Sequence, residues 1–102
     1  MQIFDVDMSD KAQDDLISIT EYLNRFSIEI GDKYYALIME KVLKLNTLPL
    51  SYPLLRDPVL RKKGIRWTYA RNYIIYFVVK EDINQVIVER ILYSRRAYDA
   101  IL

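Results

Sequence analysis

The sequence predicts an α+β fold in which a helical hairpin packs on one face of a mainly antiparallel sheet. Three observations predict it: an apolar–polar alternation over residues 4–8, two amphipathic stretches between residues 10 and 46, and three β-like runs between residues 62 and 93. The elements follow one another in the order β-α-α-β-β-β. At 102 residues we expect one domain, spanning residues 1–102.

The two helices are predicted from their caps and apolar stripes. Ser9 is of the right type to cap the first helix, whose apolar face carries Ala12, Leu16, Ile19, Leu23 and Phe26. Ser27 can cap a second helix that runs to about Asn46, with an inward face made of Ile30, Tyr34, Leu37, Ile38, Val42 and Leu45. Because the connection is short, the helices should form an antiparallel hairpin.

The second half of the chain is predicted to be an antiparallel ribbon. Pro49, Pro53 and Pro58 indicate an extended, irregular connection over residues 49–58. Strands are then expected over Lys62–Tyr69, Tyr73–Lys80 and Gln85–Tyr93, and the short turns between them require antiparallel neighbours. A short amphipathic helix or turn is expected from Arg95 to Ile101.

The central run of this ribbon, residues 73–79, is apolar on both faces. The helical hairpin can cover only one of them, so the other face must be covered by the C-terminal segment or by a partner. We favour a partner, and expect the lone chain to be poorly soluble.

Composition excludes several kinds of site. Cysteine and histidine are absent, which excludes disulfides, thiolate nucleophiles, Cys-based metal sites and the usual general base. The two glycines cannot form a phosphate-binding loop, and the acidic pairs Asp5/Asp7 and Asp14/Asp15 are interpreted as solvated faces. We expect no metal and no cofactor.

The chain begins without a secretion signal and has no apolar run long enough for a membrane span, so we expect a cytoplasmic protein.

Charge is divided unevenly along the chain. Residues 1–53 carry five basic and nine acidic side chains, whereas residues 54–102 carry ten basic and five acidic ones. This split indicates either a basic working surface in the C-terminal half or simply solvated strands and turns, and sequence alone favours neither.

The side chains that are present leave two kinds of function possible: RNA cleavage without histidine, and binding without catalysis. Cleavage needs charge stabilisation, for which Arg66, Arg90, Arg95 and Arg96 are candidates beside Lys62 and Lys63, and proton transfer, for which the candidates are Tyr73, Tyr93 and Tyr98. Structural roles compete with these. Arg90 can be an ion-pair partner, and Trp67 can pack under the proline-rich connection. Arg95 and Arg96 are the strongest functional candidates because they follow a strand end.

Several motifs in this order resemble the RelE/ParE superfamily of type II toxin–antitoxin toxins. They are the run over residues 15–23 (DLISITEYL), Leu48-Pro49, Gly64-x-Arg66, Asn72-Tyr73-Ile74-Ile75-Tyr76, and the segment over residues 90–96 (RILYSRR). The likeness covers nearly the whole chain. It implies a small bacterial toxin that a cognate antitoxin neutralises by wrapping its surface, in a toxin–antitoxin hetero-oligomer without a membrane partner.

Within the superfamily, RelE-like members cut mRNA on the ribosome and ParE-like members poison DNA gyrase. RelE-like nucleases place an arginine three residues before a strand tyrosine, and that position is Tyr73 here. Their Lys-x-Lys pattern falls on residues 65–68, which read Ile-Arg-Trp-Thr. The Arg-Arg ending and the long helical hairpin are more similar to ParE.

The resemblance therefore implies a ParE-like gyrase poison. Its toxic surface is expected to contain Arg66, Arg95, Arg96 and Tyr98, and its partner-binding surface Trp67, Tyr73, Arg90 and Tyr93. The alternatives are a RelE-like ribosome-dependent mRNA endoribonuclease that uses the same cations, and a degenerate, non-toxic interaction module.

Overall fold

The computed structural model describes residues 2–95. In chain order the elements are β1 (Asp5–Met8), α1 (Asp10–Asn24), α2 (Ile28–Leu43), α3 (Pro58–Lys62), β2 (Arg66–Ala70), β3 (Tyr73–Lys80) and β4 (Gln85–Tyr93). Short 3-10 turns occupy Lys44–Asn46, Pro49–Ser51 and Glu81–Ile83. The predicted β-α-α-β-β-β order is confirmed, with the small α3 as an addition.

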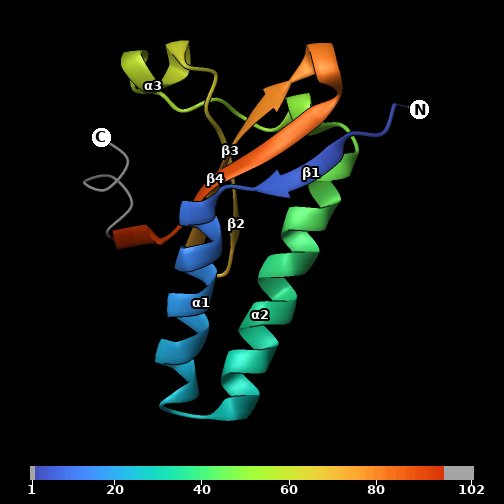
Figure 1. Cartoon of the computed structure of the whole chain (residues 1–102). Helices are drawn as coiled ribbons and strands as arrows, with labels where there is room; N and C mark the ends of the chain where they lie inside the picture. Colours follow the sequence, from blue (N-terminus) through green and yellow to red (C-terminus); the bar gives the residue numbers. More distant parts are fainter. Residues whose placement is uncertain (1, 96–102) are drawn as a thin grey trace.

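The four strands form one sheet in the order β1-β4-β3-β2, and the α1–α2 hairpin lies on one of its faces (Figure 1). β1 runs parallel to β4, while β4, β3 and β2 are antiparallel neighbours. The β3–β4 register shifts between Tyr76 and Phe77, which pair with Arg90 and Val88 respectively. Glu89 is therefore the extra residue of a β-bulge.

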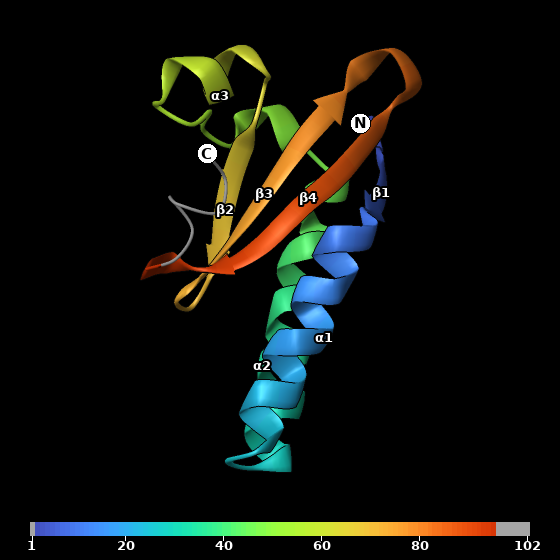
Figure 2. The same cartoon turned by 60° about the vertical axis from the view of Figure 1, so that its left-hand side comes forward.

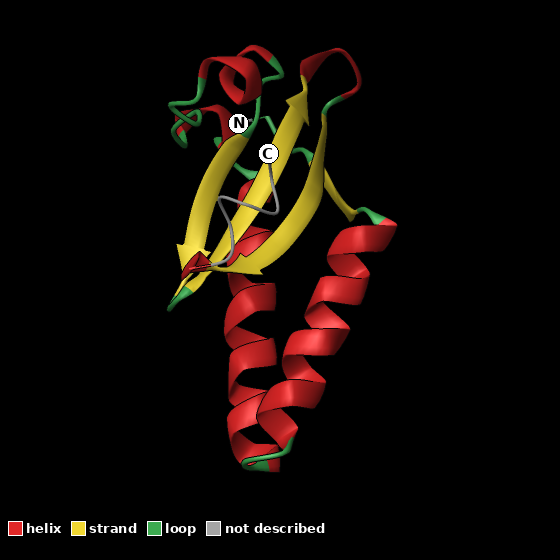
Figure 3. Ribbon diagram, turned by 90° about the vertical axis from the view of Figure 1, so that its left-hand side faces the viewer, coloured by secondary structure: helices red, strands yellow, loops and turns green. Residues whose placement is uncertain are grey.

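Both long helices begin where the sequence indicates. The Ser9 hydroxyl accepts a hydrogen bond from the Ala12 N–H at 3.0 Å, and the Ser27 hydroxyl accepts one from Ile30 at 3.4 Å. Such caps supply partners for N–H groups that the first turn of a helix leaves free. The turn between the helices lies well beyond the sheet, so only part of the hairpin is covered by strands (Figure 3).

The main core lies between the hairpin and the sheet. Its fully buried side chains come from both layers and include Ala12, Ile38, Leu45, Ile75, Phe77, Val86 and Val88. The apolar stripes were predicted to continue to Phe26 and Ile30, and this is wrong: Phe26 is 69% exposed and Ile30 is 41% exposed. Both belong to the part of the hairpin that projects past the sheet.

The opposite face of the sheet carries a second, smaller cluster. Leu60 and Ile65 bury Tyr76, and the partly buried residues around them are Leu55, Trp67, Ile74, Val78 and Leu92. The expectation that a partner or the C-terminal segment must cover this face was therefore wrong in part, because the segment that contains α3 covers it (Figure 2).

The connection itself is more ordered than predicted. Asp57 caps α3 by accepting hydrogen bonds from the N–H groups of Val59 and Leu60, and Pro58 stands at the first helical position, where proline is favoured. As a result, Lys62 ends a helix, and the predicted Lys62–Tyr69 strand begins at Arg66 instead. Gly64 makes the turn between them at φ +78°, a conformation that glycine adopts without strain. Within residues 2–95, no helix combines the length and apolarity that a membrane crossing requires.

Candidate functional site

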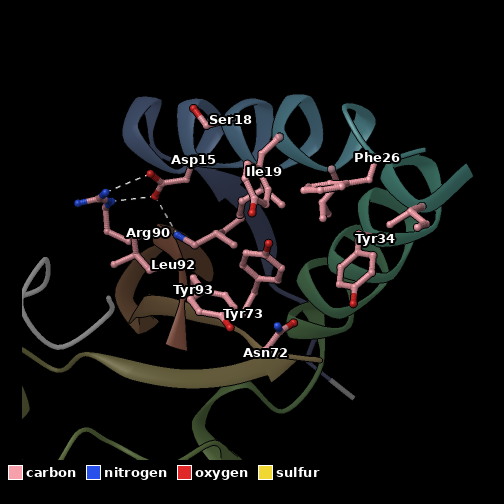
Figure 4. Close-up of a pocket in the computed structure, with 14 residues that line it drawn as sticks. Asp15, Ser18, Ile19, Phe26, Tyr34, Asn72, Tyr73, Arg90, Leu92 and Tyr93 are labelled. Atoms are coloured by element: carbon pink, nitrogen blue, oxygen red, sulfur yellow. Dashed lines mark hydrogen bonds and ion pairs between the residues drawn. The ribbon is translucent and has the colours of Figure 1, made fainter. Parts of the chain in front are cut away.

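A groove opens where the end of the sheet meets the projecting part of the hairpin. Its walls are the second half of α1, the first turns of α2, and the ends of β3 and β4 that lie beside the β2–β3 turn, and its volume is about 810 Å³ (Figure 4). That volume is within the range typical of ligand sites. We call it the tyrosine groove, because Tyr22, Tyr34, Tyr73 and Tyr93 line it together with Phe26.

The aromatic rings of the groove pack edge to face. Tyr73 is central: its ring centroid lies 6.0 Å from that of Tyr34 and 5.7 Å from that of Tyr93. At the outer end, Tyr22 of α1 and Phe26 of the turn that follows it have ring centroids 5.4 Å apart. Tyr22 is 53% exposed and Phe26 is 69% exposed, so this wall offers apolar surface to an incoming group.

An ion pair closes the other end of the groove. Arg90 donates to Asp15 through Nε, 2.8 Å from Oδ2, and through Nη2, 3.0 Å from Oδ1. Asp15 Oδ2 also accepts the Ile91 N–H at 3.0 Å. β1 pairs with β4 only as far as Met8 and Val88, so among the described residues no strand continues along this side of β4. The Asp15 carboxylate therefore accepts the Ile91 N–H in place of a strand carbonyl. The interpretation of Asp15 as part of a solvated face was therefore wrong.

The hydrogen bonds to Asp15 raise the pKa of the Arg90 guanidinium above its already high ordinary value. Arg90 is thus a fully charged structural ion-pair partner, which was one of the two roles considered for it. It still lines the groove through its side chain, as do Tyr73 and Tyr93. Three of the four predicted partner-binding residues are brought together here.

Trp67, the fourth, lies elsewhere. Its ring packs in the cluster on the face of the sheet opposite the helices, together with Leu55 and Ile74. The backbone N–H of Trp67 donates to the Pro53 carbonyl at 3.1 Å, which agrees with the alternative that Trp67 packs under the proline-rich connection.

The two predicted toxic residues that the structure describes, Arg66 and Arg95, are not brought together. Arg66 begins β2 and donates to the Tyr52 carbonyl at 2.7 Å. It lies about 13 Å along the strand from Ala70, the last residue before the β2–β3 turn. Arg95 is exposed and follows Tyr93 and Ser94 at the groove, where the Ser94 N–H donates to the Asn72 carbonyl at 2.9 Å. Arg96 and Tyr98 lie outside the described residues.

Tyr22, Phe26 and Asn72 belong to the site but were not predicted as functional. Phe26 was expected in the core because it continues an apolar stripe. The useful signal was its position immediately before Ser27, where the hairpin turn must begin. An aromatic side chain in the turn between two helices, beyond the edge of the sheet, has few neighbours of its own chain to bury it.

The chemistry of the groove favours binding. Burial, and next the neighbouring tyrosines Tyr34, Tyr22 and Tyr93, raise the pKa of Tyr73, and burial raises the pKa of Tyr76. A phenol with a raised pKa is a poor general base near neutral pH. Residues 2–95 contain no cluster of three metal-ligating side chains.

Comparisons with known proteins agree with the fold. The model of a family described as the ParE toxin of type II toxin-antitoxin system, parDE, matches residues 6–98. A chain from the chromosomal ParDE toxin–antitoxin system of P. aeruginosa superposes with a TM-score of 0.73 at 20% identity, covering 91% of this chain and 98% of that one. A chain from the RelBE2 toxin–antitoxin complex of Mycobacterium tuberculosis gives a TM-score of 0.68 at 17% identity, covering 91% and 93%. These structures share the fold, and no curated protein sequence matches the chain.

Proposed function

The chain belongs to the ParE toxin family of type II toxin–antitoxin systems, and we propose that it is the toxin of such a pair. In this proposal residues 1–102 form a single cytoplasmic toxin domain. A cognate antitoxin holds it inactive in a hetero-oligomer by occupying the tyrosine groove. The free toxin stops growth by poisoning DNA gyrase, with Arg95 on the surface that meets the target.

The observation that carries the antitoxin part of this proposal is the groove itself. Four tyrosines and Phe26 surround about 810 Å³ of open space, and the rings at its outer end are more than half exposed. Aromatic residues of this kind are enriched at the centres of protein–protein interfaces, where a partner fully desolvates them. An apolar segment of a partner chain fits such a groove better than a charged substrate does.

The state of the cations supports a gyrase target over RNA cleavage. Arg90 is held by Asp15, and Arg66 is held by the Tyr52 carbonyl. Tyr73 is only 6% exposed, and its raised pKa opposes a role as a base. Among the predicted catalytic arginines that the structure describes, Arg95 alone is exposed, and a guanidinium stabilises charge without moving a proton.

One induction experiment tests the proposal. The chain is expressed in bacteria, and three quantities are measured: growth, the positions of mRNA 5′ ends, and covalent gyrase–DNA adducts. We expect growth arrest with trapped adducts and intact mRNA. Codon-phased mRNA cuts without adducts would replace the proposal with the RelE-like endoribonuclease. Normal growth with neither effect would leave a non-toxic interaction module.

Two controls make the result specific. Arg95→Ala should abolish growth arrest, whereas Arg61→Ala, an exposed arginine on α3, should leave it intact. Co-expression with the protein encoded beside the toxin should restore growth, and the two proteins should purify together. Retained toxicity in the Arg95→Ala variant would reject Arg95 as a target contact.

A further inference from the structure

β2 is an edge strand of the sheet, and only its first half is covered. The Leu55 N–H donates to the Ile65 carbonyl at 3.0 Å, and the Trp67 N–H donates to the Pro53 carbonyl at 3.1 Å. Between these two hydrogen bonds, Leu54 and Arg66 lie opposite each other as in a pair of antiparallel strands. The covering segment stops at Trp67, so among the residues that the structure describes no strand pairs with the second half of β2 on the side away from β3.

The pairing of β2 shows which backbone groups face this open edge. In an antiparallel pair, residues alternate between turning both backbone groups toward the neighbour and turning both away. Because the Trp67 N–H points away from β3, the N–H and C=O of Tyr69 must point away as well. Within residues 2–95, no backbone group outside the sheet bonds to them. An added strand would find one donor and two acceptors here, the second acceptor being the Trp67 carbonyl.

The surroundings of the open edge are strongly basic. Residues 56–71 contain six cationic side chains and one acidic side chain, Asp57. The Asp57 carboxylate caps α3, and the two ion pairs present in residues 2–95 are Lys44–Glu40 and Arg90–Asp15. The cations of this segment therefore have no acidic partner in the described part of the chain. The exposed ones are Arg56, Arg61, Lys62, Lys63 and Arg71.

Two aromatic side chains complete the surface. The Trp67 and Tyr69 rings lie next to each other on the face opposite the helices, with centroids 6.3 Å apart, and Tyr69 is 58% exposed. Side chains on one face of adjacent strands contact each other directly. An apolar side chain of an added strand would therefore pack on Tyr69.

We propose that the open edge of β2, residues 67–70, binds an acidic extended segment of a partner protein, which joins the sheet as a fifth strand. The backbone groups of Tyr69 select a peptide over a nucleic acid, and the surrounding cations select acidic residues. The same cations repel the β2 edge of a second copy, as charges on edge strands commonly do. This surface is separate from the tyrosine groove, and it does not depend on the proposed function.

Amide hydrogen exchange on the full chain tests the proposal. The probe is a synthetic peptide of about six residues that alternates glutamate and valine, a length typical of short strands. We expect the peptide to slow exchange of the Tyr69 amide by at least about tenfold while leaving the Trp67 amide unchanged, because the latter already has a partner. A lysine–valine peptide of the same length should have no effect. Added salt should weaken the protection.

Two variants at one position separate the backbone from the side chain. Tyr69→Pro removes the outward N–H without removing a bond of the β2–β3 ladder, and it should lower peptide affinity about tenfold or more. Tyr69→Ala keeps the N–H and should retain most of the affinity. Exchange of the β3 amides reports whether each variant stays folded.

Four results would overturn the proposal. The first is a Tyr69 amide that is already protected in the free chain, and the second is equal peptide affinity in the proline variant and the unaltered chain. The third is tighter binding of an oligothymidine, detected as quenching of Trp67 fluorescence without Tyr69 protection. The fourth is protection that appears with protein concentration alone, which would assign the edge to a second copy.

Discussion

Asp15 and Arg90, 75 residues apart in the sequence, form a two-pronged ion pair between α1 and β4. Asp15 also accepts the Ile91 N–H, so a single carboxylate joins the helix to the strand backbone and to the guanidinium. This contact fixes the second half of α1 against β4 and thereby sets one end of the tyrosine groove.

We expect Asp15→Ala to lower the free energy of unfolding by about 1–3 kcal/mol, because it leaves the Ile91 N–H and a partly buried guanidinium without their acceptor. Urea unfolding measures the change. The matched control is Asp14→Ala, which removes an exposed carboxylate one residue earlier and should change stability by less than about 0.5 kcal/mol. Equal effects of the two variants would show that the ion pair contributes no net stability.

Substitutions in the outer wall of the tyrosine groove should weaken antitoxin binding and leave the stability of the fold nearly unchanged. Replacing Tyr22 and Phe26 together by serine removes two rings that are more than half exposed, so stability should change little. Affinity for the antitoxin should fall at least about tenfold in a titration followed by calorimetry. Tyr35→Ser is the control, since Tyr35 is 48% exposed and lines a different pocket of the hairpin. Loss of affinity in the control alone would move the antitoxin site to that pocket.

Stability should fall in alkaline solution. The pKa of Tyr73 is raised in the folded chain, chiefly by burial. As the pH rises above the ordinary value near 10, the unfolded chain loses this proton while the folded chain still holds it, so the free energy of unfolding decreases. Tyr73→Phe should make the decrease shallower, with Tyr76 still contributing its own share.

The pH effect is measured by urea unfolding at a series of alkaline pH values. Tyr69→Phe, at a tyrosine that is 58% exposed, serves as the control and should leave the slope unchanged. An unaltered slope in the Tyr73→Phe variant would mean that Tyr73 titrates alike in the folded and unfolded chains.

Arg66 and Arg95 should respond differently to replacement by alanine. Arg66→Ala removes the donor to the Tyr52 carbonyl and should cost about 1 kcal/mol of stability, while growth arrest persists below the melting temperature. Arg95→Ala removes an exposed side chain and should leave stability within about 0.5 kcal/mol while abolishing growth arrest. Thermal melts and growth assays on the same variants give both quantities. The reverse pattern would place the toxic surface at the start of β2.

Local signals predicted much of the fold. Ser9 and Ser27 mark the starts of α1 and α2 because a hydroxyl that bonds the first turn acts within three residues. The strands β3 and β4 were predicted with the bounds that the structure has, since β-rich runs between turn residues are also local patterns. α3 was missed because three nearby prolines indicated an irregular connection, although the Asp57-Pro58 pair is itself a helix start.

The candidate site was only partly predictable. Tyr73, Arg90 and Tyr93 were named as partner-binding residues and do line one groove, but Trp67 and Arg66 lie elsewhere. Nothing in the sequence indicates that Asp15, rather than the adjacent Asp14, faces Arg90. That choice depends on the angle at which α1 leaves β1 and crosses the edge of β4, which no local pattern records.

The sequence by itself determined the two long helices and the four strands, their order and the antiparallel ribbon, because caps, turns and hydrophobic periods act over a few residues. It also determined the inventory of side chains, and so excluded histidine and cysteine chemistry. Only the tertiary structure decided which cations are engaged, which aromatic rings stay exposed, and where the β2 edge remains open. Each of these depends on residues distant in the chain, such as Asp15 and Arg90, meeting through the packing of helices on the sheet.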